Sequence, residues 1–307
     1  MRPALGTAAA VALCAAATAG CGVGPGEDAG EVELTVTRDY GSELLIDEQD
    51  SISESDTVLR LLDSSAEVET RYGGGFVQSI DGLSGERADD RSSDWFFYVD
   101  GIESPVGAAE YELGDGERVW WDYHDWTSAM RVPAVVGSWP EPFLHGFDGE
   151  RYLTEVRCPR AGEVCGTVFD RLEAAGAEVV MPSDESTEPA GPRAAVLVGT
   201  WARLRTDPDA QLLASGPEQS GVFARFSGDR RALLTLLNQR AEPAGSLGRG
   251  AGLVAALRPD DGPPTWVVTG TDPAGVAAAA ELIGEPLANR FAVATDPGGE
   301  PIGVPVP

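Results

Sequence analysis

Alternation of polar and apolar side chains begins at residue 31. The segment Glu31–Thr37 places apolar residues at every second position, which predicts a half-exposed β-strand. The segment Thr57–Leu62 follows two N-cap candidates, Ser55 and Asp56, and has apolar side chains at positions 58, 59, 61 and 62. That spacing predicts a short amphipathic helix.

Segments rich in aromatic and β-branched residues follow the predicted helix. They predict strands because such side chains fit a pleated, half-buried surface, and they span residues 76–80, 95–99 and 117–123. The dipeptides Asp81-Gly82 and Asp100-Gly101 come directly after the first two and predict tight turns. This order of strand, helix and several strands predicts a small β-rich sheet with one packed helix, a β-grasp-like α+β domain over residues 31–126.

A passage rich in proline and glycine, residues 127–150, separates this block from the rest of the chain. It is either a linker or an arm that packs back on the first domain. From residue 151 onward, alanine-rich helical segments stand between apolar runs, which predicts a mixed α/β domain over residues 151–307. Helices are expected at residues 165–175, 230–238 and 273–283, and strands at residues 153–156, 177–181, 194–199, 221–226, 252–257, 265–269 and 291–294.

The first 20 residues have the pattern of a signal peptide. Arg2 is their only charge, and an alanine-rich run follows that is shorter than the roughly 20 apolar residues a stable membrane span needs. Small residues before a cysteine suit a lipoprotein signal peptidase, so Cys21 is the expected lipid anchor and residues 21–30 a flexible acidic tether. Thr18 departs from the usual aliphatic residue at its position. Secretion with cleavage nearby and no lipid is the alternative.

The charge balance of the chain argues against several classes of binding partner. The formal net charge is −28, with 50 acidic and 22 basic residues, and every basic residue is arginine. Without lysine, Schiff-base and phosphate-loop lysine chemistry is excluded. Nucleic acid is not an expected partner, because phosphate binding needs a positive face. Anionic lipids would repel the chain, so we expect it to meet the membrane through its lipid alone, and solubility outside the cell is the simplest reason for the acidity.

Four cysteines are present. Cys14 lies in the predicted signal peptide and Cys21 is assigned to the lipid, which leaves Cys158 and Cys165. In an exported protein these two are expected to form a local disulfide. A metal site at the pair is the weaker alternative, because no histidine lies near either cysteine in the sequence.

Four ordered motifs occur between residues 57 and 123. They are Thr57-Val-Leu-x-Leu-Leu62, Phe76-Val-x-Ser-Ile-Asp-Gly82, Asp94-Trp-Phe-Phe-Tyr-Val-Asp-Gly101 and Val119-x-Trp121-x-Tyr123. Together they resemble the transcobalamin-like C-terminal domain family, in which the aromatic run is typically followed by Val-Asn-Gly where this chain has Asp100. The resemblance does not extend into residues 127–307.

The resemblance implies a β-grasp-type fold that binds a soluble ligand. Eukaryotic relatives use this domain as one jaw on cobalamin, and their other jaw is a large helical barrel that this chain lacks. Bacterial relatives are commonly exported or surface-anchored, and some look like accessory proteins of energy-coupling-factor vitamin transporters. The resemblance therefore implies cobalamin or another vitamin-like molecule as ligand, no further cofactor, and such a transporter as partner.

Aromatic side chains are expected on both faces of the predicted sheet, because alternate side chains of a strand share a face. A small sheet with one helix needs only one apolar face, so rings on the other face would be partly exposed and suited to a flat ligand or a partner protein. The predicted ligand-binding residues are Trp95, Tyr98, Trp120, Trp121, Tyr123 and His124. The alternative is that the 127–150 passage covers this face through Trp139, Phe143 and Phe147.

His124 lies between Asp122 and Asp125, where it could ligate a metal or a cobalt. A single histidine with no second histidine or cysteine nearby is a weak metal signal, and a surface turn histidine is the more frequent case. No metal site is predicted.

Enzyme motifs are missing from the sequence. It has no Gly-x-Ser-x-Gly, no His-Glu-x-x-His and no phosphate loop, and any catalytic triad would have to use His124 or His145. No enzymatic activity is predicted. The turn Thr269–Gly275 could present backbone N–H groups to an anion, but a helix start capped by Asp272 is the simpler interpretation.

These observations predict an extracytoplasmic lipoprotein, anchored to the cell membrane at Cys21, that captures a small ligand and passes it to an uptake transporter. The alternative is a structural or protein-interaction lipoprotein of the cell envelope that uses an exposed aromatic surface. A concave aromatic pocket would favour the first and a flat aromatic patch the second.

Overall fold

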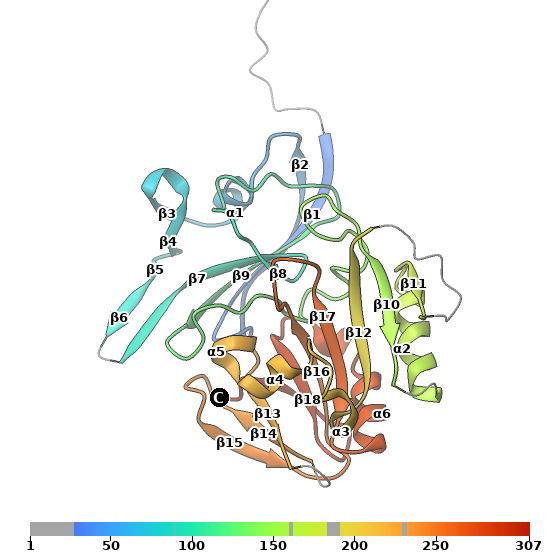
Figure 1. Cartoon of the computed structure of the whole chain (residues 1–307). Coiled ribbons are helices and arrows are strands. Elements are labelled where there is room, and N and C mark those ends of the chain that lie inside the picture. Colours follow the sequence, from blue (N-terminus) through green and yellow to red (C-terminus); the bar gives the residue numbers. More distant parts are fainter. Residues whose placement is uncertain (1–27, 89, 160–161, 183–190, 229–231) are drawn as a thin grey trace, which may run out of the picture.

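The computed structural model describes residues 28–88, 90–159, 162–182, 191–228 and 232–307 (Figure 1). The predicted signal peptide, Cys21 and most of the predicted tether lie outside these residues. The described chain is largely β-structure with short helices, which is broadly the expected α+β class. Within this part of the chain, no helix is both long and apolar enough to cross a membrane.

The N-terminal part is built on one sheet, with strand order β2-β1-β9-β7-β6 and β8 paired to β7. Strand β1 runs parallel to β9, and the other neighbours are antiparallel. The strands are β1 (Asp28–Arg38), β2 (Glu43–Ser53), β6 (Glu86–Ala88), β7 (Arg91–Val99), β8 (Ile102–Glu103) and β9 (Arg118–Asp125). The strands expected at residues 31–37, 95–99 and 117–123 are therefore confirmed as parts of β1, β7 and β9.

Helix α1 (Val58–Ser65) and a small second sheet cover one face of this sheet. The Thr57 hydroxyl caps α1 by accepting a hydrogen bond from the Arg60 N–H at 3.3 Å, and Val58, Leu61 and Leu62 are buried. The small sheet has the order β3-β4-β5, with β3 (Val68–Arg71), the short 3₁₀ turn η1 (Tyr72–Gly74), β4 (Phe76–Ile80) and β5 (Leu83–Ser84). The helix and the strand at residues 76–80 were both expected.

The C-terminal part is built on a seven-stranded sheet of order β11-β10-β12-β17-β16-β18-β19. The first four strands are mutually parallel and the last three pairings are antiparallel. Its strands are β10 (Leu153–Arg157), β11 (Val179–Val180), β12 (Arg193–Thr200), β16 (Gly252–Leu257), β17 (Thr265–Gly270), β18 (Ala292–Thr295) and β19 (Pro301–Val304). The strand expected at residues 177–181 is present only as the two residues of β11.

Helices and a hairpin sheet cover the two faces of this large sheet. Buried residues of α2 (Glu163–Ala174) and α6 (Pro273–Glu281) pack with the Val196 and Val268 face. The Leu197 and Val267 face packs against a second group of elements. That group contains α3 (Trp201–Leu204), α4 (Gln211–Ser215), α5 (Pro217–Ser220), and the three-stranded sheet of β13 (Ala224–Ser227), β14 (Leu233–Leu237) and β15 (Pro243–Leu247).

The helix expected at residues 230–238 is wrong. Its described residues form strand β14, which pairs with β13 and β15, while Arg230 and Arg231 lie outside the described residues. Leu234 and Leu236 are buried and Leu233 is exposed, so the side chains alternate as in a strand. A short leucine run suits either a helix or a strand, and pairing with two neighbours decides the outcome here.

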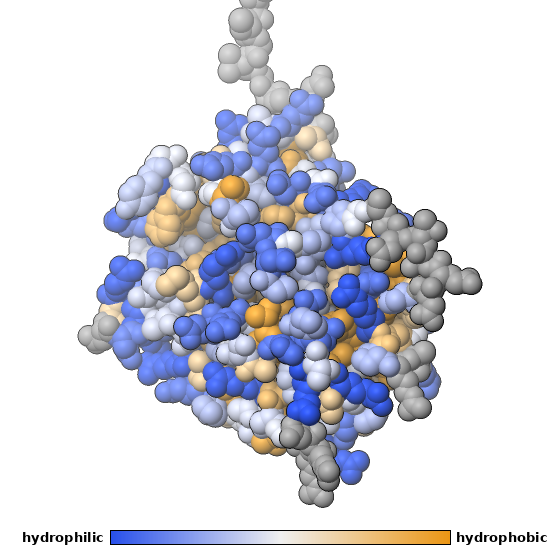
Figure 2. Space-filling view, viewed as in Figure 1, coloured by the Kyte–Doolittle hydropathy of each residue, from blue (hydrophilic) through white to orange (hydrophobic). Residues whose placement is uncertain are grey.

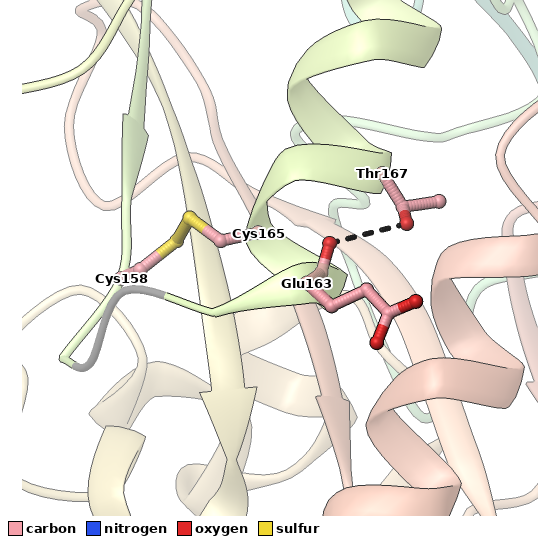
Figure 3. The surroundings of a disulfide bond; sticks show 4 residues. All are labelled: Cys158, Glu163, Cys165 and Thr167. Carbon is pink, nitrogen blue, oxygen red and sulfur yellow. Dashed lines mark hydrogen bonds between the residues drawn. A yellow bond between two sulfur atoms is a disulfide. The ribbon is translucent and has the colours of Figure 1, made fainter.

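The expected disulfide between Cys158 and Cys165 is present (Figure 3). It joins the residue after β10 to the first turn of α2, and the Thr167 hydroxyl donates to the Glu163 carbonyl one turn along the same helix. The bridge therefore fixes the start of α2 against the carboxyl end of a parallel strand.

The two halves share a continuous interior. One cluster of buried residues joins the N-terminal sheet, through Tyr40, Tyr98 and Trp120, to Phe223 and Phe291 of the C-terminal half. Figure 2 shows a surface on which hydrophilic residues dominate and hydrophobic ones form small separate groups. The apolar surface of both sheets is thus used to join the halves.

Candidate functional site: a cleft between the two halves

The predicted aromatic residues are buried. The exposed fraction is 5% for Trp95, 0% for Tyr98 and 2% each for Trp120, Trp121 and His124. Only Tyr123 is half-exposed, and its hydroxyl donates to the Ser84 carbonyl at 3.0 Å. The expected solvent-facing aromatic surface is therefore wrong, because another part of the chain covers the second face of the sheet.

Phe291 and Phe223 of the C-terminal half provide most of this cover. The ring centroid of Phe291 lies 5.1 Å from that of Trp120 and 5.6 Å from that of Tyr98. Val132 and Val135, from the 127–150 passage, belong to the same buried cluster. The passage is therefore a packed arm, which was the alternative expectation.

The arm does not use the three aromatic residues expected to cover that face. Phe143 lies 4.8 Å from Trp266 of β17, and Trp139 lies 6.1 Å from the same ring, measured between ring centroids. Phe147 packs 6.0 Å from Tyr111. Trp139 and Phe143 thus join the arm to the other face of the C-terminal sheet, whereas Phe147 packs on the N-terminal half.

A buried carboxylate, Asp122, organises the turn that follows β1. Its Oδ1 accepts a hydrogen bond from the Tyr40 N–H at 3.1 Å. Its Oδ2 accepts from the Gly41 N–H at 2.8 Å and from the Thr37 hydroxyl at 2.5 Å. Because Asp122 is fully buried, these bonds hold the turn at residues 39–42 in one position.

His124 belongs to the same network. Its Nδ1 lies 2.8 Å from Asp122 Oδ1, and its ring stacks between Tyr40 at 4.4 Å and Phe96 at 4.5 Å. The frequent case of a surface turn histidine therefore does not apply. Among the residues that the structure describes, no group of three or more histidine, cysteine or carboxylate side chains is placed to hold a metal ion.

Beside this network lies a cleft of about 690 Å³ between the two halves. The N-terminal half contributes the 39–42 turn and Arg91, at the start of β7. The C-terminal half contributes the turn after β14, the segment before β18, and β19 with the residues after it. The lining residues used below are Tyr40, Gly41, Arg91, Arg240, Arg290 and Gly303.

Tyr40 separates the cleft from the buried network. Its side chain is only 5% exposed, and its hydroxyl donates to the Asp125 carbonyl at 2.6 Å. Burial, with Asp122 and Asp125 nearby, raises the pKa of Tyr40 far above its usual value, so the hydroxyl stays protonated and remains a donor.

Gly41 is required where the turn meets the other half. Its φ of +77° lies in the left-handed region, and a Cβ on this residue would lie 2.0 Å from the Asn289 carbonyl oxygen. Asp122 therefore holds the turn from one side while Asn289 limits it from the other. The wall of the cleft is formed in advance of any ligand.

Three arginines and one aspartate line the cleft. Arg91 Nε lies 3.8 Å from Asp125 Oδ2, and Asp39 lies 3.9 Å from Arg38. Within the described part of the chain, the guanidinium groups of Arg240 and Arg290 form no ion pair and no hydrogen bond. The cleft is therefore locally basic in a chain of net charge −28.

None of the residues that line this cleft was predicted from the sequence as part of a site. Strand β2 was not expected, so the Asp39-Tyr-Gly-Ser42 turn between β1 and β2 was not recognised as a structural feature. The other wall comes from residues near the end of the sequence that have no motif of their own. The one available signal was the Tyr-Gly pair in a polar stretch, which is typical of a turn.

A comparison with family models matches residues 55–125 to a domain of unknown function, DUF4430. This stretch is similar to a family that is related to transcobalamin-like domains. The match confirms the family resemblance over these residues. Of the residues that line the cleft, only Arg91 lies within the matched stretch, because the 39–42 turn and the whole C-terminal wall fall outside it. A comparison with curated protein sequences found no match.

Two solved structures match part of the chain. Haptocorrin in complex with Cbi matches at a TM-score of 0.26 and 15% identity, over 32% of this chain and 26% of the haptocorrin chain. A protein from Ruminococcus gnavus ATCC 29149, described as a candidate metal binding protein, matches at a TM-score of 0.25 and 15% identity, over 31% of this chain and 97% of its own. This chain thus spans about a quarter of the haptocorrin chain, and we base no function on either likeness.

Proposed function

We propose that this protein is an extracytoplasmic lipoprotein that binds a small molecule in the cleft between its two halves. The observation that supports this proposal is the cleft itself. Its volume of about 690 Å³ lies within the roughly 300–1,000 Å³ of small-molecule sites, which favour junctions between domains. Its turn wall is fixed by Asp122, and preformed walls reduce the ordering cost of binding.

A vitamin-like molecule is the proposed ligand class, and cobalamin is the member to test first because of the motif resemblance. Neither histidine lines the cleft: His124 is buried below Tyr40, and His145 hydrogen-bonds Glu141 at 2.8 Å. A corrinoid bound in this cleft would therefore have no histidine of this chain on its cobalt. No enzymatic activity is part of the proposal.

Membrane attachment through a lipid on Cys21 is the second part of the proposal. A stable hold usually takes more than one acyl chain, which a fully processed lipoprotein cysteine carries. The proposed partner is an uptake transporter in the same membrane, such as one of the energy-coupling-factor type, which would receive the ligand from the cleft.

Ligand binding can be tested with the mature chain, residues 21–307, produced without its signal peptide. We expect a vitamin from a panel that includes cobalamin and its precursors to raise the Tm at saturating concentration. A Ser42→Trp variant, which places an indole at the mouth of the cleft, should lose that shift while keeping the Tm of the free protein. A panel with no shift in the parent chain would reject this part of the proposal.

The anchor can be tested in the producing cell. Mass spectrometry of the membrane-extracted protein should find a lipid on Cys21, and Cys21→Ser should release the chain from the membrane fraction. An unmodified N-terminus on the wild-type protein would show secretion without a lipid.

One observation favours a protein partner as a second candidate function. Tyr72 is 88% exposed and Phe76 is 37% exposed where η1 meets β4, so two aromatic side chains lie in solvent within the DUF4430 stretch. Exposed aromatic residues are frequent anchors of protein interfaces. Loss of a cross-linked partner from cells that carry Tyr72→Ser and Phe76→Ser would support this alternative.

A further inference from the structure

The charges of the cleft are opposite to those of the chain. Acidic residues outnumber arginines by 50 to 22, yet three arginines and only Asp39 among the acids line the cleft. An exposed arginine in so acidic a chain has many carboxylates available to it. Two arginines without such a partner at one cleft therefore mark the place where a negative charge from outside would be most stabilised.

Arg290 is the better placed of the two. It is half-buried, and a Cβ on Gly303 would lie 3.1 Å from its Nη1, so the guanidinium lies directly over the backbone of β19. Its planar group therefore lies against the wall of the cleft, without a carboxylate partner among the described residues. Because the planar guanidinium fork is pre-organised, little conformational entropy is lost for each hydrogen bond that it forms with an anion.

Arg240 faces the same cleft from the turn after β14. Its backbone N–H donates to the Asn238 side-chain oxygen at 3.0 Å, which fixes the turn, while its exposed side chain has no partner within the described residues. Arg91 adds a third positive charge, shared with Asp125 at 3.8 Å. The cleft thus presents one guanidinium paired with a carboxylate, that of Arg91, and two without such a partner among the described residues.

Part of the remaining lining is apolar. Ile302 and Val304 of β19 and the residues after them, Pro305 and Val306, line the side opposite the 39–42 turn. They offer an organic ligand apolar surface beside the arginines. A bare inorganic ion would leave this wall uncovered.

We propose that the ligand of this cleft is an organic anion, a small molecule with an apolar body and a carboxylate, phosphate or sulfonate group that Arg290 and Arg240 bind. The inference rests on the proposed function and adds the chemical class of the ligand. A cationic ligand would meet three arginines, and a neutral one would cover the guanidinium groups without replacing their hydration.

Two dyes with one skeleton test the charge requirement. The sulfonate 1-anilinonaphthalene-8-sulfonate and the neutral N-phenyl-1-naphthylamine differ in the sulfonate group, and both fluoresce in apolar sites. We expect the mature chain to bind the sulfonate at least ~10-fold more tightly, since a charge-assisted contact gives about 1.4 kcal/mol or more. Added salt should weaken the binding of the sulfonate and leave the binding of the neutral dye unchanged.

Charge variants then locate the effect. Arg240→Gln with Arg290→Gln should raise the Kd of the sulfonate ~10-fold or more and change the Kd of the neutral dye less than about 2-fold. The matched control is Arg60→Gln with Arg249→Gln, which removes the same net charge at exposed sites outside the cleft. Gly303→Ala displaces the Arg290 guanidinium but keeps its charge. This variant should weaken the binding of the sulfonate as well.

The outcomes separate the two proposals. If both dyes bind equally and the Arg240 and Arg290 variants bind like the parent chain, the anion inference is overturned while binding in the cleft stands. If neither dye binds, or if Ser42→Trp leaves both unaffected, the cleft is not a site for organic anions of this kind and the anion inference fails, while the vitamin panel decides the proposed function separately. Circular dichroism of each variant checks that the fold is retained.

Discussion

The ring of Phe291, in the residue directly before β18, lies 5.1 Å from the ring of Trp120 in β9, with 72° between the ring planes. The same phenyl ring lies 4.9 Å from Tyr40 and 5.5 Å from His124. One side chain of the C-terminal half is therefore inserted among rings of the N-terminal sheet. This contact turns a face that a lone sheet would expose into the interior of the molecule.

Removal of this ring should weaken the whole chain. Phe291→Ala creates a cavity between the two halves and is expected to lower the free energy of unfolding by about 3–5 kcal/mol. Guanidinium denaturation followed by tryptophan fluorescence measures it, and Trp120 should emit at longer wavelength in the variant. The control Phe76→Ala removes an exposed ring and should change stability by less than about 1 kcal/mol. Equal effects of the two variants would contradict the role of Phe291.

Where neighbouring residues alone determine a helix or strand, the sequence pattern predicted it correctly. Alternation identified β1, the N-terminal cap and spacing identified α1, and aromatic content identified β7 and β9. Strand β2 was not predicted, because most of its side chains face solvent and polar and apolar residues do not alternate along it. The run at β14 was assigned to a helix because leucine suits both structures and only its pairing distinguishes them.

The site could not be predicted because distant residues make it. Aromatic residues on both faces of the sheet were recognised, but what covers them is Phe291, far along the chain from Trp120. The cleft likewise joins a turn at residues 39–42 to residues 288–307, and neither segment has a motif. The overall composition indicated an acidic protein, and it gave no sign that arginines outnumber acidic residues along the lining of the cleft.

The hydrogen bonds of Asp122 should be needed for both stability and binding. Asp122→Ala leaves the Tyr40 and Gly41 N–H groups buried without an acceptor, and each unsatisfied donor costs about 1–3 kcal/mol. We expect the variant to lose roughly 2–5 kcal/mol in the free energy of unfolding and to bind the ligand more weakly than the parent chain does. Urea denaturation and a binding titration of the same sample give both numbers.

Asp122→Asn makes a sharper comparison with the alanine variant. Its amide keeps one oxygen acceptor but places an N–H₂ group where the carboxylate accepts a bond, so it should recover only part of the lost stability. Asp47→Asn, in the exposed strand β2, makes the same chemical change without a buried partner and should be neutral. Full recovery by Asp122→Asn would show that shape alone, and not the acceptor pattern, fixes the turn.

The Cys158–Cys165 disulfide should stabilise the C-terminal half by restricting the unfolded chain. The cysteines are seven positions apart, and the loop-entropy relation for so short a loop gives about 2.5 kcal/mol. The double variant Cys158→Ser and Cys165→Ser should lower the Tm under oxidising conditions, and dithiothreitol should lower the Tm of the parent chain only. A parent chain that is insensitive to the reductant would contradict this contribution.

A buried carboxyl group, Asp100, should make the protein less stable as the pH rises. Burial, and secondarily the nearby Glu141, raises the pKa of Asp100 well above its ordinary value of 3.8. Its Oδ1 accepts a hydrogen bond from the Arg118 N–H at 2.9 Å, and its Oδ2 has no hydrogen-bond partner within the described chain. Burial also raises the pKa of Glu103 and of Glu117, so these groups act in the same direction.

The sign of the pH effect follows from the raised pKa values. Between the unfolded and the folded pKa of Asp100, the folded chain keeps a proton that the unfolded chain has released, so the free energy of unfolding falls as the pH rises. The stabilisation by the neutral carboxyl is complete below the unfolded pKa, and it is lost as the pH rises through the folded pKa. Thermal unfolding between pH 4 and pH 8 should therefore show a falling Tm for the wild-type chain.

Asp100→Asn isolates the contribution of this group. The amide is neutral at every pH and keeps an oxygen for the Arg118 N–H, so the variant should be more stable than the wild type at pH 8 by a few degrees in Tm. The advantage should shrink toward pH 4, where the wild-type carboxyl is neutral as well. Asp63→Asn, at an exposed position of α1, makes the same chemical change in solvent and should leave the pH profile of Tm unaltered. If the Tm of Asp100→Asn falls with pH in parallel with the Tm of the wild type, Asp100 does not hold a proton in the folded chain. The pH dependence of Tm must then come from Glu103 and Glu117.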